Sequence, residues 1–507
     1  MSFPVSHAEI TQRCAKLAHQ IADNLADRQS DDGSFPLPDF YAKAFAANLW
    51  ARIDRDKYRV NIDRALHALT HQPQDKTYHR EFIEYALLDM PGLSQQGRSE
   101  ILRASSNQCP DVANWQILGL INRQSRANGI WDRLVSIAHY HFIRSRYWRS
   151  PVFLDRPRCF SAQYHAFCAA LLVESISPSQ QKTARIATRL IADMTGSHGY
   201  ANLLGRGAGQ SFGTVCALFT LLKYGAPDQA CAILCHLEDA FDKCGSLPLN
   251  LLVPNPLPPN PGTINPGPAN PKTPGWYSYN RHDDYLAFAG YWLSKAANLA
   301  PSKTALSLPK KSNRPSQVFL FSSKHYHAQM ALTGQQCFDY TPAPVIVLGH
   351  AETACLLLPP TGGEQDSPSL YGPATAPLPA LDGGDVSRFV SAKRRSSNQV
   401  EITFELDGIT GQRSIVFSDN DVTIKDQFPS TLPKTPDLFR ILIDGNLDLR
   451  QVSDTEYTVP RIGVTITSDH PLTFDKTDAF SAAGAATRIT AQGSNCAILK
   501  LRWEDQE

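Results

Sequence analysis

Hydrophobic residues in the first 300 positions recur with the spacing of an α-helix. The stripe formed by Ile10, Cys14, Leu17, Ile21 and Leu25 is typical, because residues three or four apart share one face of a helix. Comparable stripes predict further helices near 41–53, 62–69, 79–90, 112–126, 130–146, 160–174, 180–194, 208–223, 227–243 and 283–298. Short connections between such helices favour antiparallel hairpins, and many hairpins in succession predict a ring or partial ring around a central cleft, that is, a complete or incomplete (α/α) toroid.

Beyond residue 316 the hydrophobic period changes from 3.6 to 2. Ile402, Phe404 and Leu406 alternate with polar neighbours, and turn signals such as Asp407-Gly408 separate the alternating runs. Helices first and strands afterwards predict an α+β multidomain chain. We expect a toroid at 1–300, a linker at 301–315 and an antiparallel β-sandwich at 316–507.

Charge and composition narrow the range of partners. Lys and Arg number 49 and Asp and Glu 48, and this net charge of +1 argues against a broad nucleic-acid or anionic-membrane surface. The chain has no apolar run of about 18 residues, so no membrane span is expected. Its 11 cysteines form no CxxC pair, and the N-terminus lacks an apolar signal core, which together predict a reduced, cytoplasmic protein, or a secreted or periplasmic one if a signal has been trimmed from the chain. Oligomeric state stays open.

The densest polar and aromatic stretch of the chain directly precedes the helix predicted at 283–298. The carboxylates of Asp283 and Asp284 fall in its first turn, where they suit the helix dipole. The preceding segment 247–274 holds ten prolines and cannot be regular helix or central strand. A lid over a site is one interpretation, and a surface crossover before an ordinary amphipathic helix is the other. The stretch contributes the candidate site residues Trp276, Tyr277, Tyr279, Asn280, Arg281 and His282.

A glycine-rich run at 198–213 contributes the candidates Arg206 and Gln210. Its five glycines allow close approach of backbone to backbone or to a ligand. The run is no Walker loop, because no GK[ST] follows, and it is no dinucleotide fingerprint, because a helical region precedes it. Arg206 beside a helix start is either a carboxylate clamp or a surface arginine on a structural turn.

Two further helix starts carry polar side chains that packing does not require. Gln163 and His165 flank a buried stripe that includes Tyr164, and His165 is either a functional or a structural histidine. Asn114 and Trp115 could form a sugar platform or a helix cap with a buried tryptophan. We expect neither cofactor nor metal. His325 and His327, two apart on a predicted strand, are the only spacing that leaves a metal site open.

This organisation resembles polysaccharide lyases of the heparinase II/III-like and alginate-lyase type. The resemblance rests on Gly205 to Gln210, Tyr279 to Tyr285 and, in the predicted sandwich, Arg413 to Asp426. The Asn-His pair that usually precedes the catalytic tyrosine in that family is not evident, and Gln163-Tyr164-His165 stands in its place. The resemblance implies an (α/α) toroid joined to an antiparallel β-domain and an acidic oligosaccharide or polysaccharide as substrate.

What the resemblance implies chemically is β-elimination at a uronic acid. A base removes the C5 proton, an acid protonates the C4 oxygen that leaves, and cations or amides neutralise the carboxylate. The expected roles are acid for Tyr279, base for His165 and carboxylate clamp for Arg206. The expected substrate-binding residues are Gln163, Gln210, Asn280, His282, Arg281, Trp276, Tyr277, Asn114 and Trp115.

Two other functions stay open at this point. The first is a glycoside hydrolase on an (α/α) barrel, whose paired carboxylates would come from Asp283, Asp284, Asp32 or Asp193. The second is a glycan-binding or biosynthetic accessory protein without catalysis.

Overall fold

The structure is a computed structural model of the 507-residue chain. It describes residues 5–36, 39–74, 77–102, 110–127, 129–252, 281–306, 317–334, 345–349, 355–357, 362–364, 367–369, 378–381, 387–429, 432, 434–476, 480–481, 484–492 and 495–504.

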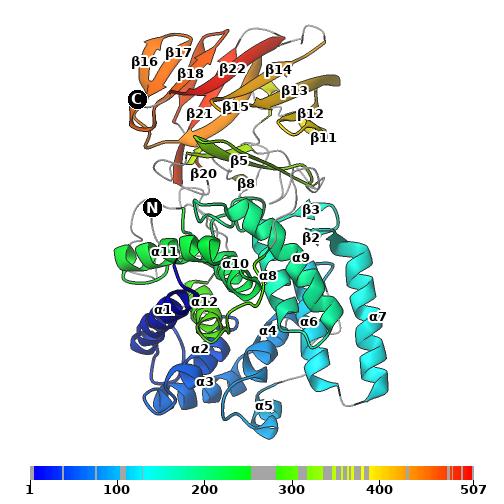
Figure 1. Cartoon of the computed structure of the whole chain (residues 1–507), viewed down its shortest axis with the longest axis vertical. Coiled ribbons are helices and arrows are strands. Elements are labelled where there is room, and N and C mark those ends of the chain that lie inside the picture. The colour runs from blue at the N-terminus through cyan, green and yellow to red at the C-terminus, as the bar shows by residue number, and fades with distance from the viewer. Residues whose placement is uncertain are drawn as a thin grey trace.

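The helical half alternates inner and outer helices around a ring (Figure 1). The inner helices are α2 (Ala42–Ile53), α4 (Thr77–Leu88), α6 (Ala113–Arg126), α8 (Ala162–Val173), α10 (Ser211–Tyr224) and α12 (His282–Ala297). The outer helices are α1 (His7–Arg28), α3 (Arg59–His71), α5 (Gln95–Ile101), α7 (Ile130–Tyr147), α9 (Pro178–Thr195) and α11 (Pro227–Cys244). Each inner helix contacts the next, and α12 packs against α2, so the ring closes.

Aromatic side chains from the inner helices fill the centre of the ring. Phe212 of α10 stacks on Phe288 of α12 with ring centroids 3.9 Å apart, and Phe167 of α8 meets both rings edge-on. Phe45 and Phe82 extend this cluster to α2 and α4. The closed ring is therefore a packed core, and polar chemistry is confined to its ends.

A small sheet, which the hydrophobic pattern did not predict, interrupts the helical half. Its antiparallel strands are β1 (Trp148–Arg149), β2 (Val152–Arg156) and β3 (Cys159–Phe160). Strands this short carry too few residues to show an alternation. The sheet brings the chain from the end of α7 to the start of α8.

The second half consists mainly of two large antiparallel sheets. The first runs in the order β19 (Leu472–Asp475), β21 (Gly484–Gln492), β15 (Pro436–Asp444), β7 (Cys355–Leu357), β6 (Val345–Gly349), β5 (Tyr326–Ala331) and β4 (Val318–Ser322), with β10 (Ala380–Leu381) on β15 and β20 (Phe480–Ser481) on β21. The second runs in the order β11 (Arg388–Ser396), β12 (Gln399–Leu406), β13 (Ile409–Phe417), β14 (Asp421–Gln427), β22 (Cys496–Trp503), β18 (Val464–Ser468), β17 (Glu456–Val459) and β16 (Arg450–Ser453). A separate hairpin pairs β8 (Gly362–Glu364) with β9 (Ser367–Ser369).

The first sheet is the middle layer of the molecule, between the helical ring and the second sheet (Figure 1). Strand β4 shows why: Phe319 faces the sandwich core, whereas Val318 and Leu320 join residues of the helical half. Gln329 of β5 also donates from Nε2 to the carbonyl of Met194 at the end of α9, at 2.6 Å. A strand buried on both faces loses its polar–apolar alternation.

The predicted α+β class, with helices first and an antiparallel sandwich after, is confirmed. The ring closes by the contact of α12 with α2, where the sequence left a complete or an incomplete toroid open. Helix α12 ends at Ala297 and strand β4 begins at Val318. Of the predicted lid at 247–274, residues 253–274 lie outside the described part of the chain.

Candidate functional site

The inner helices begin at one end of the ring, which we call the mouth. It comprises the first turns of α2, α4, α6, α8, α10 and α12 and the loop 198–210. Because inner and outer helices alternate as hairpins, the inner helices run in one direction. Leu203 and Leu204 of the loop pack against the first sheet, so the mouth faces the sandwich. Six helix starts pointing at one region supply amide donors and positive dipole ends there.

Asp284 joins the mouth of α12 to that of α2. Its carboxylate accepts hydrogen bonds from the backbone amides of Phe40, Tyr41 and Ala42, at 3.1, 2.8 and 2.7 Å. These amides precede or begin α2 and have no partner inside the helix, so the carboxylate caps α2 from across the ring. Asp284 therefore has a structural role, because it joins α12 to the start of α2.

Gln163 and Gln210 form a buried amide pair between α8 and α10. Nε2 of Gln163 donates to Oε1 of Gln210 at 3.0 Å, and both side chains are buried. The glycine-rich loop makes this pair possible. A Cβ on Gly207 would lie 2.3 Å from the Gln163 amide, and one on Gly205 would lie 2.3 Å from the carbonyl of Phe160. Both glycines have positive φ, at 80° and 76°, which glycine adopts without strain.

Arg206 and two tyrosines lie beside this amide pair. The Arg206 guanidinium is centred 5.5 Å from the ring of Tyr164, within cation–π range. Burial raises the pKa of Tyr285 well above its usual value, the neighbouring Tyr164 adds to this rise, and Arg206 opposes it. Tyr285 is consequently a neutral phenol that can donate a hydrogen bond. Gln163 also opposes the rise in the pKa of Tyr285.

Tyr164 and Tyr285 were not among the predicted functional residues. Both follow helical spacing in stripes with Phe167 and Phe288, and that spacing indicates core residues. The rings do pack in the core against Phe212. Their position in the first turn of an inner helix was the signal that could have marked them.

His165 does not fit the role of C5 base. Its Nδ1 accepts from the backbone amide of Phe153 at 3.0 Å, and its Nε2 donates to the carbonyl of Ala187 at 3.2 Å. Both ring nitrogens are thus occupied by backbone. Burial lowers the pKa of this histidine to about 4, so the ring stays neutral and its lone pair is already used. We therefore correct His165 from base to structural histidine.

His282, the first residue of α12, is the remaining candidate base among the described residues. Its Nε2 lies 3.1 Å from the carbonyl of Leu247, which fixes this nitrogen as the proton donor. Its Nδ1 lies 3.8 Å from Oδ1 of Asp283 and is buried without a hydrogen bond in the described part of the chain. Asp283 also accepts from Nε of Arg28 at 2.9 Å. Burial raises the pKa of Asp283, but His282 and Arg28 together hold it below its usual value.

The other predicted residues lie at or near the mouth with different degrees of contact. Arg281 places its guanidinium 5.5 Å from the ring of Phe40, next to α2. Asn114 is buried in the first turn of α6, and Trp115 packs partly against the helical core. Trp276, Tyr277, Tyr279 and Asn280 lie outside the described residues, so the structure does not place them.

The four carboxylates predicted as acid–base candidates of a glycoside hydrolase lie in different surroundings. Asp32 is exposed and accepts from the Ser34 amide and hydroxyl at 2.9 and 2.6 Å. Asp193 lies on outer helix α9. Asp39, which the sequence did not single out, is buried beside Asp284. Burial raises the pKa of Asp39, against the attraction of Lys43. Together with Asp32, it lines a pocket of about 980 Å³ near the start of α2.

The region around His325 and His327 does not gather metal ligands in the part of the chain that the structure describes. Nδ1 of His327 lies 2.7 Å from the Ser322 hydroxyl, and its ring is 4.8 Å from that of His198. No group of three His, Cys, Asp or Glu side chains suited to a metal ion occurs among the described residues. Nor is any described helix long and apolar enough to cross a membrane.

Several solved structures are similar to this chain. A Streptomyces coelicolor A3 chondroitin AC lyase in complex with chondroitin sulphate is 9% identical and covers 100% of this chain and 81% of its own, with a TM-score of 0.48. An α-1,6-mannanase from Salegentibacter sp. is 12% identical and covers 56% and 98%, with a TM-score of 0.39. An unsaturated glucuronyl hydrolase variant from Streptococcus agalactiae is 11% identical and covers 58% and 92%, with a TM-score of 0.36.

These likenesses are to a chondroitin lyase and two glycoside hydrolases rather than to a heparinase. No protein-family model matches the sequence, and no curated protein matches it.

Proposed function

We propose that this chain is a lyase that cleaves a uronic-acid-containing glycan by β-elimination at the mouth of the ring. The observation that carries the proposal is the meeting of Arg206 with Tyr164 beside the buried Gln163–Gln210 pair. A fixed cation, amide groups and neutral phenols next to several helix starts are suited to a carboxylate and to the negative charge that develops when C5 loses its proton.

Arg206 is the group that neutralises the substrate carboxylate. Arg206 is half-buried at the mouth, so the residue keeps some exposed surface while its guanidinium is positioned by the ring of Tyr164. The Ser161 hydroxyl donates to the carbonyl of Arg206 at 2.6 Å and holds the backbone of the loop against α8. A planar guanidinium suits a carboxylate because it can donate two parallel hydrogen bonds.

The proton transfers require a base for C5 and an acid for the C4 oxygen. His282 takes the role of base in place of His165, because its Nδ1 bonds no backbone group of the described chain and lies 3.8 Å from Asp283, whose charge stabilises the ring once it has taken up the proton. Tyr279, three residues before His282, is the proposed acid. Tyr164 is the described tyrosine that could take that role, since its ring already lies beside Arg206.

Incubation with a panel of acidic glycans, followed by ultraviolet absorbance of unsaturated uronate, tests the proposal. We expect unsaturated product from the wild type and a loss of about 10²-fold or more in kcat/KM for Arg206→Ala, the scale for one lost oxyanion donor. Arg185→Ala is a matched control. Arg185 lies on outer helix α9 and makes a comparable cation–π contact, with its guanidinium 5.8 Å from the ring of Tyr224. Equal losses in both variants would contradict a special role for Arg206.

A glycoside hydrolase is the second candidate, and the Asp284–Asp39 pair is the observation in its favour. Burial and the charge of Asp39 raise the pKa of Asp284, and burial raises the pKa of Asp39. One of the two carboxyls therefore stays protonated at a pH where a free aspartate is ionised. A protonated carboxyl beside an ionised one is the pattern of an acid and its partner base. New reducing ends without the unsaturated chromophore would favour this function. Binding without any product would favour the accessory role.

A further inference from the structure

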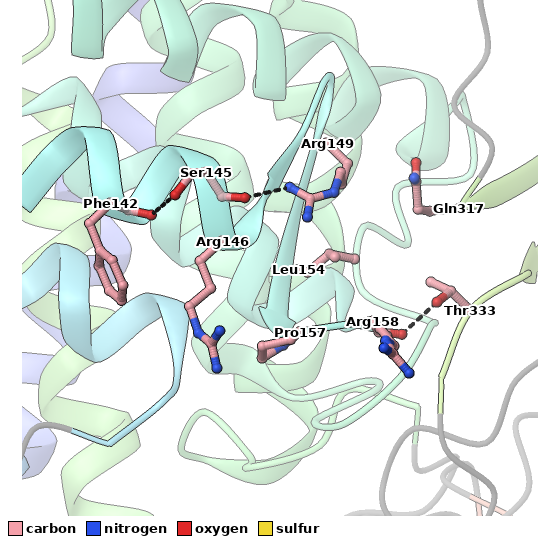
Figure 2. Close-up of a pocket in the computed structure, with 9 residues that line it drawn as sticks. All are labelled: Phe142, Ser145, Arg146, Arg149, Leu154, Pro157, Arg158, Gln317 and Thr333. Atoms are coloured by element: carbon pink, nitrogen blue, oxygen red, sulfur yellow. Dashed lines mark hydrogen bonds between the residues drawn. The ribbon is translucent and has the colours of Figure 1, made fainter.

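A pocket of about 460 Å³ lies where the helical ring meets the first sheet (Figure 2). The end of α7 and the turn between β2 and β3 form one side of it, and Gln317 and Thr333 at the edge of the sheet form the other. Its size falls within the range of about 300–1,000 Å³ that small-molecule sites occupy.

Arginines dominate the polar lining of this pocket. Arg146, Arg149 and Arg158 all line it, and Figure 2 shows their guanidinium groups on different sides of Leu154 and Pro157. Arg146 is paired with Asp111 outside the pocket lining. Arg149 uses Nη1 to bind the carbonyls of Ser145 and Trp148 at 3.0 and 2.8 Å, which keeps its charge intact. The lining therefore has an excess of positive charge.

Arg158 is held in the pocket at a conformational cost. Its φ of 69° lies in the left-handed region, which is uncommon for residues other than glycine. Its carbonyl accepts a hydrogen bond from the Thr333 hydroxyl, so the turn is tied to the sheet domain. The side chain is exposed, and the described residues show no ion pair to it.

The remaining lining combines apolar and polar groups. Phe142, with 49% of its surface exposed, lies on the side of α7 and the β2–β3 turn with Leu154, Pro157 and the hydroxyl of Ser145, and Gln317 and Thr333 supply polar groups on the sheet side (Figure 2). A sugar ring has an apolar face and hydroxyl edges, and an acidic sugar adds an oxyanion that matches a guanidinium. Phosphate-like ions alone would leave the apolar surface unused.

We propose that this pocket binds one acidic sugar unit of a glycan, through a carboxylate or sulfate group placed against Arg149 and Arg158. This pocket would anchor the glycan away from the mouth, by holding a different sugar unit of the glycan whose cleaved unit lies at the mouth. Only the choice of glycan rests on the proposed lyase function. The alternative source of the same chemistry is a free inorganic oxyanion.

Calorimetric titration with defined probes tests the site independently of catalysis. The probes are glucuronate-containing and sulfated trisaccharides, a neutral trisaccharide and sodium sulfate, all titrated into the full chain carrying Arg206→Ala to weaken the mouth. We expect an acidic trisaccharide to bind, the neutral one not to bind, and Arg158→Gly to weaken binding at least tenfold. Arg158→Gly removes the guanidinium and relieves the positive φ, so misfolding would not explain a loss.

Arg133→Ala, an exposed arginine of α7 outside the pocket, is the matched control and should leave the affinity unchanged. Unchanged affinity in Arg158→Gly and in Arg149→Ala would overturn the proposal. Binding of sodium sulfate without binding of any trisaccharide would also overturn it. So would equal affinities for the neutral and the acidic trisaccharides. Arginine-dependent binding, together with no unsaturated product from the wild type on any acidic glycan, would uphold this site while the lyase proposal fails.

Discussion

The side-chain amide of Gln163 donates to Oε1 of Gln210 at 3.0 Å, inside the mouth and away from solvent. These residues lie 47 positions apart and mark the first turns of α8 and α10. The contact needs a close approach of the two helices, and Gly213 supplies it. A Cβ on Gly213 would lie 2.6 Å from Cα of Gln163.

Gly213→Ala should therefore destabilise the helical half, by about 1–3 kcal/mol, as expected for an added methyl group in a packed core. Gly119→Ala makes the same substitution within α6, where the nearest atom to the new Cβ would be 3.9 Å away. There the higher helix propensity of alanine should stabilise by up to about 1 kcal/mol. Urea denaturation of both variants measures the difference, and equal changes would contradict the close approach of α8 and α10.

Tyr279→Phe removes one hydroxyl and little volume, so the variant should fold like the wild type. If Tyr279 is the acid for the C4 oxygen, kcat should fall about 10²-fold or more, as for a lost acid–base group. Tyr164→Phe gives the comparison with the tyrosine that lies beside Arg206. Near-full activity of Tyr279→Phe with a large loss in Tyr164→Phe would transfer the role to Tyr164.

His165 should affect stability with a characteristic pH dependence. Its pKa falls from 6.5 to about 4 on folding, because burial disfavours the charged ring. The unfolded chain therefore binds more protons between about pH 4 and 6.5, and this residue lowers the free energy of unfolding as pH falls through that window, by up to about 3 kcal/mol. His165→Asn should be less stable at pH 7 and should lose this part of the pH dependence.

Measurement of unfolding free energy at pH 7 and pH 5 checks the prediction, with exposed His67→Asn as control. The difference between wild type and His165→Asn should shrink at the lower pH. A constant difference would mean that the ring is not buried and neutral in the folded chain.

The sequence predicted those parts of the fold that repeat locally. Outer helices such as α1 keep one face in water, so their buried stripe of Ile10, Cys14 and Leu17 shows the helical period directly. Helix α8 is buried along its whole length, so no polar face reveals its orientation. Spacing alone could not tell that His165 points to backbone while Gln163, two residues earlier, reaches Gln210.

The closure of the ring could not be predicted for a similar reason. It depends on a hydrogen-bonded contact between residues more than 240 positions apart, Asp284 and the start of α2. First-turn carboxylates were expected to suit their own helix dipole. The carboxylate of Asp284 instead caps a different helix, and only the packing of α12 against α2 determines which one.

In the sandwich, Arg413 and Asp426 form a buried ion pair. They are the first and last residues of the segment on which the resemblance to lyases rested, and the sequence did not predict that they pair. Nε and Nη2 of Arg413 donate to the two oxygens of Asp426 at 2.6 and 2.7 Å, and the Phe439 amide also donates to Oδ2 at 2.8 Å. Asp426→Asn leaves a buried guanidinium without its counter-charge and should cost about 3–5 kcal/mol.

The exposed pair of Arg450 and Asp448, 3.1 Å apart, is the matched control. Both side chains are 65% exposed, so Asp448→Asn should change stability by less than about 1 kcal/mol. Thermal unfolding of the two variants gives the comparison. Similar small losses in both would contradict the burial of the Arg413–Asp426 pair.

Asp284 offers the last prediction, because its surroundings act in opposite directions. Burial and the charge of Asp39 raise its pKa, whereas the amides of Tyr41, Phe40 and Ala42 stabilise the ionised form. The rise prevails, so the folded chain keeps a proton that the unfolded chain releases near pH 4, and stability should fall as pH rises from about 4 towards neutrality.

Asp284→Asn removes the charge but keeps one acceptor for the α2 amides. We expect this variant to lose the decline in unfolding free energy relative to the wild type over that range. Asp54→Asn, at an exposed aspartate that follows α2, is the control and should retain the decline. If the wild type instead gains stability relative to Asp284→Asn as pH rises, the three amides dominate and Asp284 is an ionised cap, which would also remove the support for a hydrolase.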